Sequence, residues 1–167
     1  MIAFKRILVP LDGSTLSERS LPLAMTLARK FDSHIILLRV VDRLDTASSS
    51  VSETLGIWRI QVGQHASQEA EVYLEAQRDN LIRSGFDVST LLCHASPADG
   101  ILNAATDHAV DLIAMSTHGH GGIARWAVGS VADKVVRHSQ CPVLLVRQKL
   151  GVDLEVQLAQ MVPKTGD

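Results

Sequence analysis

Residues 111–131 read DLIAMSTHGHGGIARWAVGSV, and this segment says most about the architecture of the chain. A short apolar run, typical of a buried strand, passes into a loop of small residues, after which Gly129 and Ser130 open a helical pattern. The first N–H groups of a helix have no partner within it and attract anions. Glycines let the main chain approach a ligand closely, and hydroxyls donate to phosphate oxygens. The segment therefore predicts a strand–loop–helix unit that binds phosphate.

The rest of the chain alternates apolar runs with helical patterns. Runs with strand character span residues 4–11, 34–41, 86–92, 111–116 and 142–147. Helical patterns lie between them at 15–31, 64–84, 97–108 and 126–139. This alternation predicts an α/β fold with a five-stranded parallel sheet and helices on both faces, a doubly wound, Rossmann-like architecture.

The composition of each run predicts its place in the sheet. The first, second and fourth runs are almost wholly apolar, as central strands should be, whereas 86–92 alternates and suits an edge. The simplest strand order is 3-2-1-4-5. Ligands of such sheets bind beyond the carboxyl ends of strands, where the order reverses. We therefore expect the loops at 10–15 and 116–122 to meet at a binding crevice.

Several residues mark the ends of the expected helices. Thr15 and Glu18 have the spacing of a capping box, and Ser96 precedes a proline suited to the first helical position. Gly85 is suited to end the second helix in a left-handed conformation. Pro22 conflicts with a helix over 15–31, so we expect either a kink or a helix start near Ser20.

Length and composition indicate one globular domain. The chain has 167 residues, 46% of them hydrophobic and 20% charged, with a formal net charge of −2. The charge disfavours nucleic-acid binding, and no apolar run approaches the length of a membrane span. We expect the domain to cover 1–147 and the tail, 148–167, to be partly disordered. The long connection at 42–63 predicts a mobile flap over a bound base or an extra helical turn.

The cysteines and the first residues favour a cytoplasmic location. Cys93 and Cys141 lack CxxC spacing and lie in apolar segments, which predicts two reduced thiols. The short apolar stretch near the N-terminus runs directly into the domain pattern, so no secretory signal is evident.

Two motifs near residue 119 favour other ligands only weakly. Residues 119–124 match the dinucleotide pattern G-x-G-x-x-A, but the next strand ends at Val146 and Arg147 instead of an acidic residue. His118 and His120 form an H-x-H pair without a further ligand at suitable spacing, so we expect no metal site. Donation to phosphate, or no functional role, is the better interpretation of these histidines.

A third spacing fits better. Ser116 and Gly119 are followed after nine residues by Gly129 and Ser130. This resembles the nucleotide-binding pattern of the universal stress protein family, G-x-x-G-x9-G-[ST], with serine in place of the first glycine. The resemblance extends from Phe4 to Arg147 and includes ILVPLDGS, LLRVVD, MSTHG and HSQCPVLLVR.

The resemblance implies binding of ATP or AMP, with or without Mg²⁺. The phosphates would lie at the glycine loop and the helix start, Asp12 would bind the ribose, and an apolar slot would hold adenine. From the residues alone, Asp12 in Asp-Gly-Ser also suits a turn that organises the first helix. The residues expected to contact the nucleotide are Pro10, Leu11, Asp12, Val40, Met115, Ser116, His118, Gly119, Gly129, Ser130 and Val131.

The resemblance further implies a stress-response regulator whose nucleotide occupancy is reported to another protein. It implies a homodimer in which the last strand, Pro142 to Val146, pairs with its copy. Asp12 is the one obvious carboxylate near the expected crevice, so efficient phosphoryl transfer is not expected. Two alternatives stay open: a weak ATPase or nucleotide-dependent transferase, and an interaction protein with an empty crevice.

Overall fold

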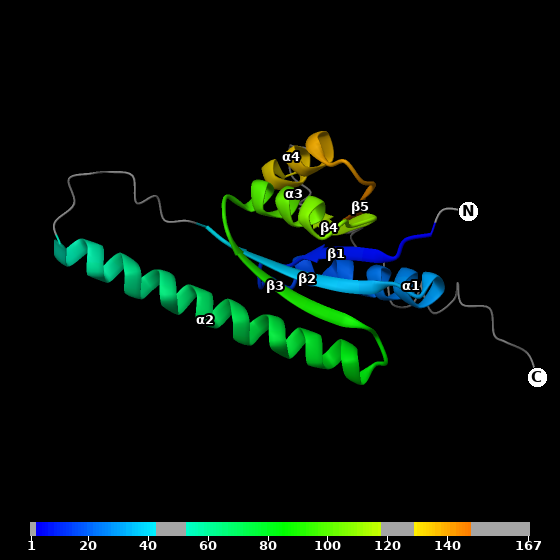
Figure 1. Cartoon of the computed structure of the whole chain (residues 1–167), viewed down its shortest axis with the longest axis horizontal. Coiled ribbons are helices and arrows are strands. Elements are labelled where there is room, and N and C mark those ends of the chain that lie inside the picture. Colours follow the sequence, from blue (N-terminus) through cyan, green and yellow to red (C-terminus); the bar gives the residue numbers. More distant parts are fainter. Residues whose placement is uncertain (1–2, 43–52, 118–128, 148–167) are drawn as a thin grey trace, which may run out of the picture.

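The computed structural model describes the backbone of residues 3–42, 53–117 and 129–147, and the side chains of these residues except 53–62. Strands alternate with helices along the chain (Figure 1). The elements are β1 (Arg6–Pro10), a 3₁₀ turn η1 (Ser17–Ser20), α1 (Leu21–Phe31), β2 (His34–Val41), α2 (Glu53–Arg83), β3 (Val88–His94), α3 (Pro97–Asp107), β4 (Leu112–Thr117), α4 (Ser130–His138) and β5 (Val143–Arg147).

The five strands form one parallel sheet in the order β3-β2-β1-β4-β5, which confirms the expected topology. Helices α3 and α4 lie on one face, and α1 and α2 on the other (Figure 1). Each face of the sheet has its own hydrophobic core, and successive residues of the central strand β1 point into opposite cores. Ile7 and Val9 pack toward α1 and α2, and Leu8 packs toward α3 and α4. All three side chains are fully buried, as a doubly covered strand requires.

The register shows how the sheet opens at one end. Between β1 and β4, Ile7 pairs with Leu112 and Leu8 pairs with Ile113, and the pairing stops there. On its other side, β1 stays paired with β2 as far as Pro10. The carboxyl ends of β1 and β4 therefore separate at the reversal of strand order, which leaves room for a ligand.

The start of the first helix differs from the expected capping box. The chain forms a 3₁₀ turn before α1, and no side chain caps either helix start. Pro22 then stands in the first turn of α1, so the late start near Ser20 is confirmed and the capping box of Thr15 and Glu18 is wrong. The carboxylate of Glu18 instead accepts hydrogen bonds from two side chains of α2.

The second helix is longer than expected. It begins at Glu53, not near 64, so residues 53–63 belong to a 31-residue helix rather than to a flap. Gly85 follows this helix at a φ of +82, which is the left-handed ending that was expected. The strand β3 begins two residues later than expected, at Val88. Residues 43–52 and the tail, 148–167, lie outside the described part of the chain.

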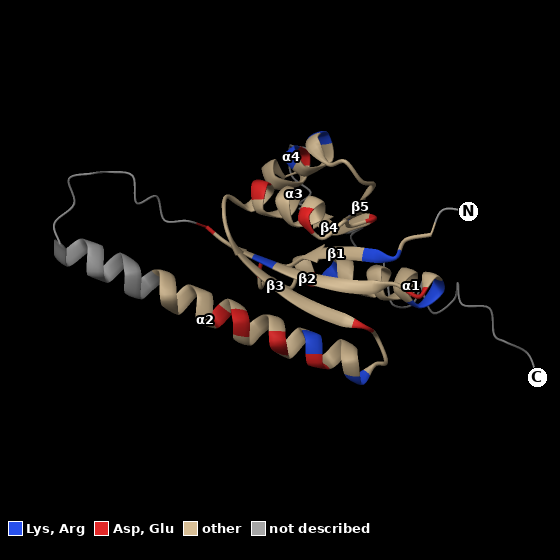
Figure 2. Ribbon diagram, in the orientation of Figure 1, with Lys and Arg blue, Asp and Glu red and all other residues tan. Residues whose placement is uncertain are grey.

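The described part of α2 carries charges of both signs, with acidic residues in its middle and the arginines toward its carboxyl end (Figure 2). Such mixing is typical of a solvated helix face. None of the helices described by the structure combines the length and apolar character needed to cross a membrane.

Candidate functional site

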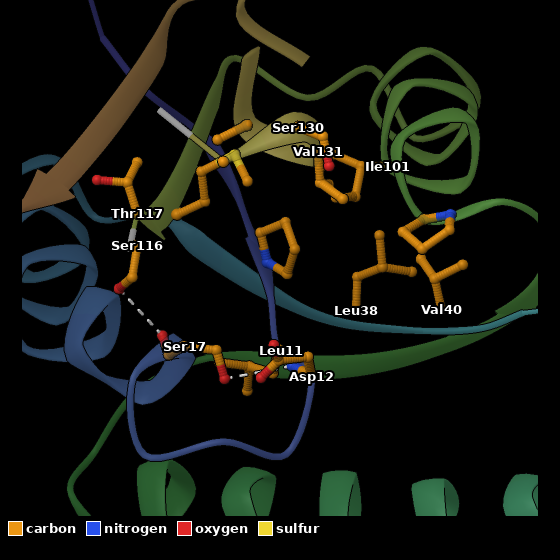
Figure 3. A pocket seen from close by; sticks show the side chains of 15 residues that line it. Leu11, Asp12, Ser17, Leu38, Val40, Ile101, Ser116, Thr117, Ser130 and Val131 are labelled. Carbon is orange, nitrogen blue, oxygen red and sulfur yellow. Dashed lines mark hydrogen bonds between the residues drawn. The ribbon is translucent and has the colours of Figure 1, made fainter. Parts of the chain in front are cut away.

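A cavity of about 340 Å³ lies beyond the carboxyl ends of β1, β2 and β4, where the strand order reverses (Figure 3). Its wall combines apolar side chains, four hydroxyl side chains, one carboxylate and the start of α4. The lining residues are Pro10, Leu11, Asp12, Ser17, Leu38, Val40, Pro97, Ile101, Met115, Ser116, Thr117, Gly129, Ser130, Val131 and Ala132.

Asp12 lies two residues beyond the end of β1, and its carboxylate organises the turn that follows. The Oδ1 atom accepts the N–H of Ser14 at 2.9 Å and the hydroxyl of Ser14 at 2.5 Å. Gly13, at a φ of +83, lets the chain turn here without the steric cost that a side chain would carry. Among the described residues, Oδ2 of Asp12 has no hydrogen-bond partner, so one carboxylate oxygen is left to accept from a ligand.

The electrostatic surroundings keep Asp12 ionised. Partial burial acts to raise its pKa, but the hydrogen bonds from Ser14, the nearby hydroxyl of Ser17 and the positive charge of Arg39 outweigh that effect. The pKa of Asp12 therefore lies below its usual value. Arg39 approaches the turn from the α2 side, with Nη1 3.4 Å from the carbonyl oxygen of Leu11. At neutral pH the crevice thus presents an acceptor that suits hydroxyl donors such as those of a ribose.

Ser17 ties the Asp12 turn to the end of β4. Its hydroxyl accepts the N–H of Asp12 at 3.2 Å and donates to the carbonyl oxygen of Ser14 at 2.8 Å. Its own carbonyl oxygen accepts the hydroxyl of Ser116 at 3.4 Å (Figure 3). The two loops that frame the crevice are therefore linked by hydrogen bonds through one buried serine.

The serine at position 116 fits its place in the strand. Ser116 lies within β4 and pairs with Val146 of β5. Among the described residues, the side-chain-bearing positions with positive φ are Asp32 and Ala109, so Ser116 has a backbone that any residue adopts. The Cβ atom that replaces the family's glycine is thus free of backbone strain.

The start of α4 supplies N–H donors. Gly129 is the N-cap residue, its carbonyl oxygen accepts the N–H of Asp133 at 2.9 Å, and no side chain caps the helix. The N–H groups of Ser130 and Val131 precede the first intrahelical bond, and both residues line the cavity. With the helix dipole they form an anion-attracting end of the crevice.

Another part of the crevice is apolar. Leu38, Val40 and Ile101 line it, and in Figure 3 their side chains gather on the side away from Thr117. Gly100 of α3 lies so close to β2 that a Cβ atom there would be 2.8 Å from Cγ1 of Val40. This close approach of α3 fixes the depth of the apolar slot, which suits a flat ring.

Nine of the eleven residues expected to contact a nucleotide line this one cavity. The other two, His118 and Gly119, lie outside the described residues. The expectation omitted Ser17, Leu38, Pro97, Ile101, Thr117 and Ala132, which also line the cavity. Pro97 and Ile101 are four residues apart on a predicted helix, so their shared face was recognisable, whereas the inward turn of Ser17 depends on the 3₁₀ geometry.

The described lining of the crevice contains neither a cysteine nor a histidine. Within residues 3–42, 53–117 and 129–147, no group of three or more His, Cys, Asp or Glu side chains is arranged to hold a metal ion. Cys93 and Cys141 are free and partly buried. Burial raises the pKa of the Cys93 thiol.

The fold and the crevice define a class: doubly wound α/β proteins with a ligand site at the reversal of strand order. Within that class the family is specific. The model of the universal stress protein family matches residues 3–147, and the chain belongs to this family.

Curated relatives match over most of their length. A putative universal stress protein of Staphylococcus aureus strain USA300 is 31% identical over 163 residues, which cover 95% of this chain and 94% of that one. The universal stress protein YxiE of Bacillus subtilis strain 168 is 29% identical over 147 residues, covering 86% and 99%.

Solved structures agree with the fold. The hypothetical protein MJ0577, the object of a structure-based assignment of biochemical function, has a TM-score of 0.74 at 27% identity and covers 89% of this chain and 99% of its own. A universal stress protein solved in complex with cAMP has a TM-score of 0.62 at 22% identity, covering 87% and 98%.

Proposed function

We propose that this chain binds an adenine nucleotide, ATP or AMP, in the crevice and that its occupancy regulates a partner protein in stress response. The observation that carries the proposal is the division of one cavity into an apolar slot, an ionised Asp12 and the uncapped start of α4. These three parts match the base, sugar and phosphates of a nucleotide in chemical kind.

Each part of the nucleotide has a proposed partner. The base lies between Leu11, Val40 and Met115, where burial of a flat ring is favourable. The ribose hydroxyls donate to Oδ2 of Asp12. The phosphates accept from the N–H groups of Ser130 and Val131, together with Gly119, His118 and the hydroxyl of Ser116.

One fold neighbour was solved with an adenine nucleotide. The fold neighbour solved with cAMP is itself a universal stress protein, and cAMP is an adenine nucleotide. Its identity of 22% carries the fold alone, so the ligand of this chain rests on the crevice and on the family pattern at Ser116, Gly119, Gly129 and Ser130.

The crevice favours binding over catalysis. Phosphoryl transfer requires a positioned base and carboxylates that hold Mg²⁺. Among the described lining residues, Asp12 is the only carboxylate, and one of its oxygens is engaged by Ser14. A regulator that responds to bound nucleotide through two conformations of different affinity fits this lining better.

The test is direct identification of the ligand. Purified protein is denatured and the released small molecules are identified by mass spectrometry, and titration calorimetry then compares ATP, AMP and cAMP with GTP. We expect adenine nucleotides to bind and GTP to bind at least about ten-fold more weakly, a difference of about 1.4 kcal/mol. Equal affinity for GTP, or no binding of any nucleotide, would overturn the proposal.

Two substitutions locate the site. Asp12→Asn should weaken adenine nucleotide binding about ten-fold or more, because hydrogen bonds to a charged group contribute roughly 1.5–3 kcal/mol. Asp107→Asn, at the end of α3 away from the crevice lining, is the matched control and should bind as the wild type does. Equal binding by both variants would place the ligand elsewhere.

We also propose a two-fold homodimer through β5. This strand is last in the sheet order, and its apolar residues Val143, Leu144 and Leu145 are only partly buried. An apolar edge of this kind favours pairing with a second copy, here antiparallel. Light scattering at micromolar concentration should give twice the mass of the chain, and a monomeric mass would contradict the pairing.

A further inference from the structure

Three polar side chains form a hydrogen-bonded row at the end of the sheet opposite to the crevice. His34 is the first residue of β2, Asp87 precedes β3, and Ser89 is the second residue of β3. The Nδ1 atom of His34 lies 2.8 Å from Oδ2 of Asp87, and its Nε2 atom lies 2.7 Å from Oγ of Ser89. The crevice lining includes none of these residues.

The order of groups fixes the direction of the hydrogen bonds. An ionised carboxylate only accepts, so Nδ1 of His34 carries the proton that it donates to Asp87. In the neutral imidazole Nε2 is then unprotonated and accepts the hydroxyl proton of Ser89. This is the arrangement of a nucleophile, a general base and a group that orients the base.

The register of the sheet holds the row together. Ile36 pairs with Ser89, and the N–H of Ile35 donates to the carbonyl oxygen of Asp87 at 2.9 Å. Because side chains alternate along strands, His34 and Ser89 lie on one face of the sheet. The His34 side chain is 31% exposed and Ser89 is partly buried, so the row is packed yet reachable from solvent.

The sheet edge offers a donor for a developing negative charge. The strand β3 is first in the sheet order and has β2 as its one neighbour there. In this parallel ladder, the bond from Ile35 to Asp87 and the bond from Ala95 to Val41 assign the odd-numbered residues of β3 to pairing with β2. The N–H of Thr90, the residue after Ser89, therefore faces the open edge, where it can donate to an oxyanion.

We propose that Ser89 is an activated nucleophile and that the Ser89–His34–Asp87 row hydrolyses small activated carboxylic esters, independently of the nucleotide crevice. Leu91, two residues further on the same face, is partly buried and supplies an apolar surface for the acyl group. Asp87 is the positioning residue, and since its side chain is 79% exposed, water screens its attraction to His34 and the expected turnover is slow.

The reaction balances without a cofactor. Oγ of Ser89 attacks the ester carbonyl carbon while its proton moves to Nε2 of His34. The bond to the leaving alcohol breaks, and that alcohol takes the proton from His34. Water then attacks the acyl-serine ester, gives one proton to His34, and releases the carboxylic acid as Oγ regains that proton.

The test uses the full chain and two probes. An alkyl fluorophosphonate should form a bond to Oγ of Ser89 with loss of fluoride, and peptide mass spectrometry maps the labelled residue. Release of p-nitrophenol from p-nitrophenyl acetate measures turnover. We expect labelling at Ser89 in folded protein and none after denaturation. Labelling elsewhere, or none in the folded chain, would overturn the proposal.

Variants separate the chemistry from mere packing. Ser89→Ala should abolish labelling, and His34→Asn should slow it by about 100-fold, the usual contribution of a general base. Asp87→Asn should slow it about ten-fold, with recovery in Asp87→Glu, because an amide no longer fixes the tautomer of His34. Ser84→Ala is the control, since Ser84 Oγ bonds to the carbonyl oxygen of Asn80, and should label normally. Equal labelling of His34→Asn and wild type would contradict activation by the histidine.

Discussion

The hydroxyl of Tyr73 donates to Oε1 of Glu18 at 2.9 Å, and this bond fastens α2 to the 3₁₀ turn that borders the crevice. The side-chain amide of Gln77 donates to the same oxygen at 3.0 Å. Partial burial, followed by the hydrogen bond and charge of Glu18, raises the pKa of Tyr73, so the phenol stays protonated and donating. These two bonds join Glu18, next to Ser17, to residues that lie 55 and 59 positions later in the sequence.

Removing the Tyr73 hydroxyl should loosen this junction. Tyr73→Phe is expected to lower the free energy of unfolding by about 1 kcal/mol, the usual net contribution of one hydrogen bond, because Gln77 still satisfies Glu18. Urea unfolding measures the change. Val72→Ala is the neighbouring control: its side chain is 64% exposed, so the loss should be within about 0.5 kcal/mol. Equal losses in the two variants would contradict a specific bond.

Glu18 also shows where sequence patterns stop being sufficient. Its spacing from Thr15 predicts a local capping box, but two donors from α2 compete for the same carboxylate. A pattern that covers four residues carries no information about a helix that arrives 55 positions later. The strand order, in contrast, was predictable, because a strand that is covered on both faces is almost wholly apolar and a strand at the edge is less so.

The residues of the site were predictable from sequence where the topology of the sheet places them. Residues at strand ends, such as Asp12 and Met115, follow from topology alone, since carboxyl ends of parallel strands meet at the reversal of order. Ser17 was missed because it depends on a 3₁₀ turn that turns its side chain inward. The start of α2 at Glu53 was missed because the apolar spacing of residues 53–63 did not distinguish a longer helix from a loop.

Acid should weaken the fold in a defined range. The pKa values of Asp12, Asp99 and Asp133 are lowered from 3.8 in the folded protein. At Asp12 the hydrogen bonds and Arg39 outweigh burial, at Asp99 the main cause is the bond with Lys134, and at Asp133 the bond with Arg137. A depressed carboxyl pKa contributes stability that is present above pH 3.8 and is lost as pH falls through the folded value.

Thermal unfolding between neutral pH and about pH 2 checks this sign. The melting temperature of the wild type should fall below pH 3.8, and that of Asp12→Asn should fall less steeply because one of the three carboxyl groups no longer titrates. Asp107→Asn changes a carboxyl group at the end of α3, outside the crevice lining, and its melting temperature should follow that of the wild type. Parallel curves for Asp12→Asn and wild type would show that the Ser14 bonds do not favour the ionised form.

Two glycines in helices should respond in opposite ways to alanine. At Gly63 a Cβ atom would meet nothing within 4 Å, so Gly63→Ala should stabilise the protein by up to about 1 kcal/mol through helix propensity. At Gly100 a Cβ atom would lie 2.8 Å from Val40 and 3.0 Å from Sγ of Cys93. Gly100→Ala should therefore cost about 1–3 kcal/mol by overpacking.

The double variant identifies the cause. Val40→Ala removes both methyl groups nearest to the new Cβ atom, so Gly100→Ala should cost less in that background than in the wild type. Urea unfolding of the four proteins in the cycle gives the coupling. Strict additivity would mean that α3 relaxes away from β2 without contact to Val40.

The end of α2 offers a test of backbone conformation alone. The N–H of Phe86 donates to the carbonyl oxygen of Leu81 at 3.1 Å and that of Gly85 to Ile82 at 2.9 Å, the two bonds of a Schellman ending. Gly85 has a φ of +82, and a Cβ atom there would meet nothing within 4 Å. Gly85→Ala should thus cost about 1 kcal/mol from the left-handed backbone, and Gly85→Asn less, because asparagine tolerates that region. Equal stability of Gly85→Ala and wild type in urea would show that the ending adopts another conformation.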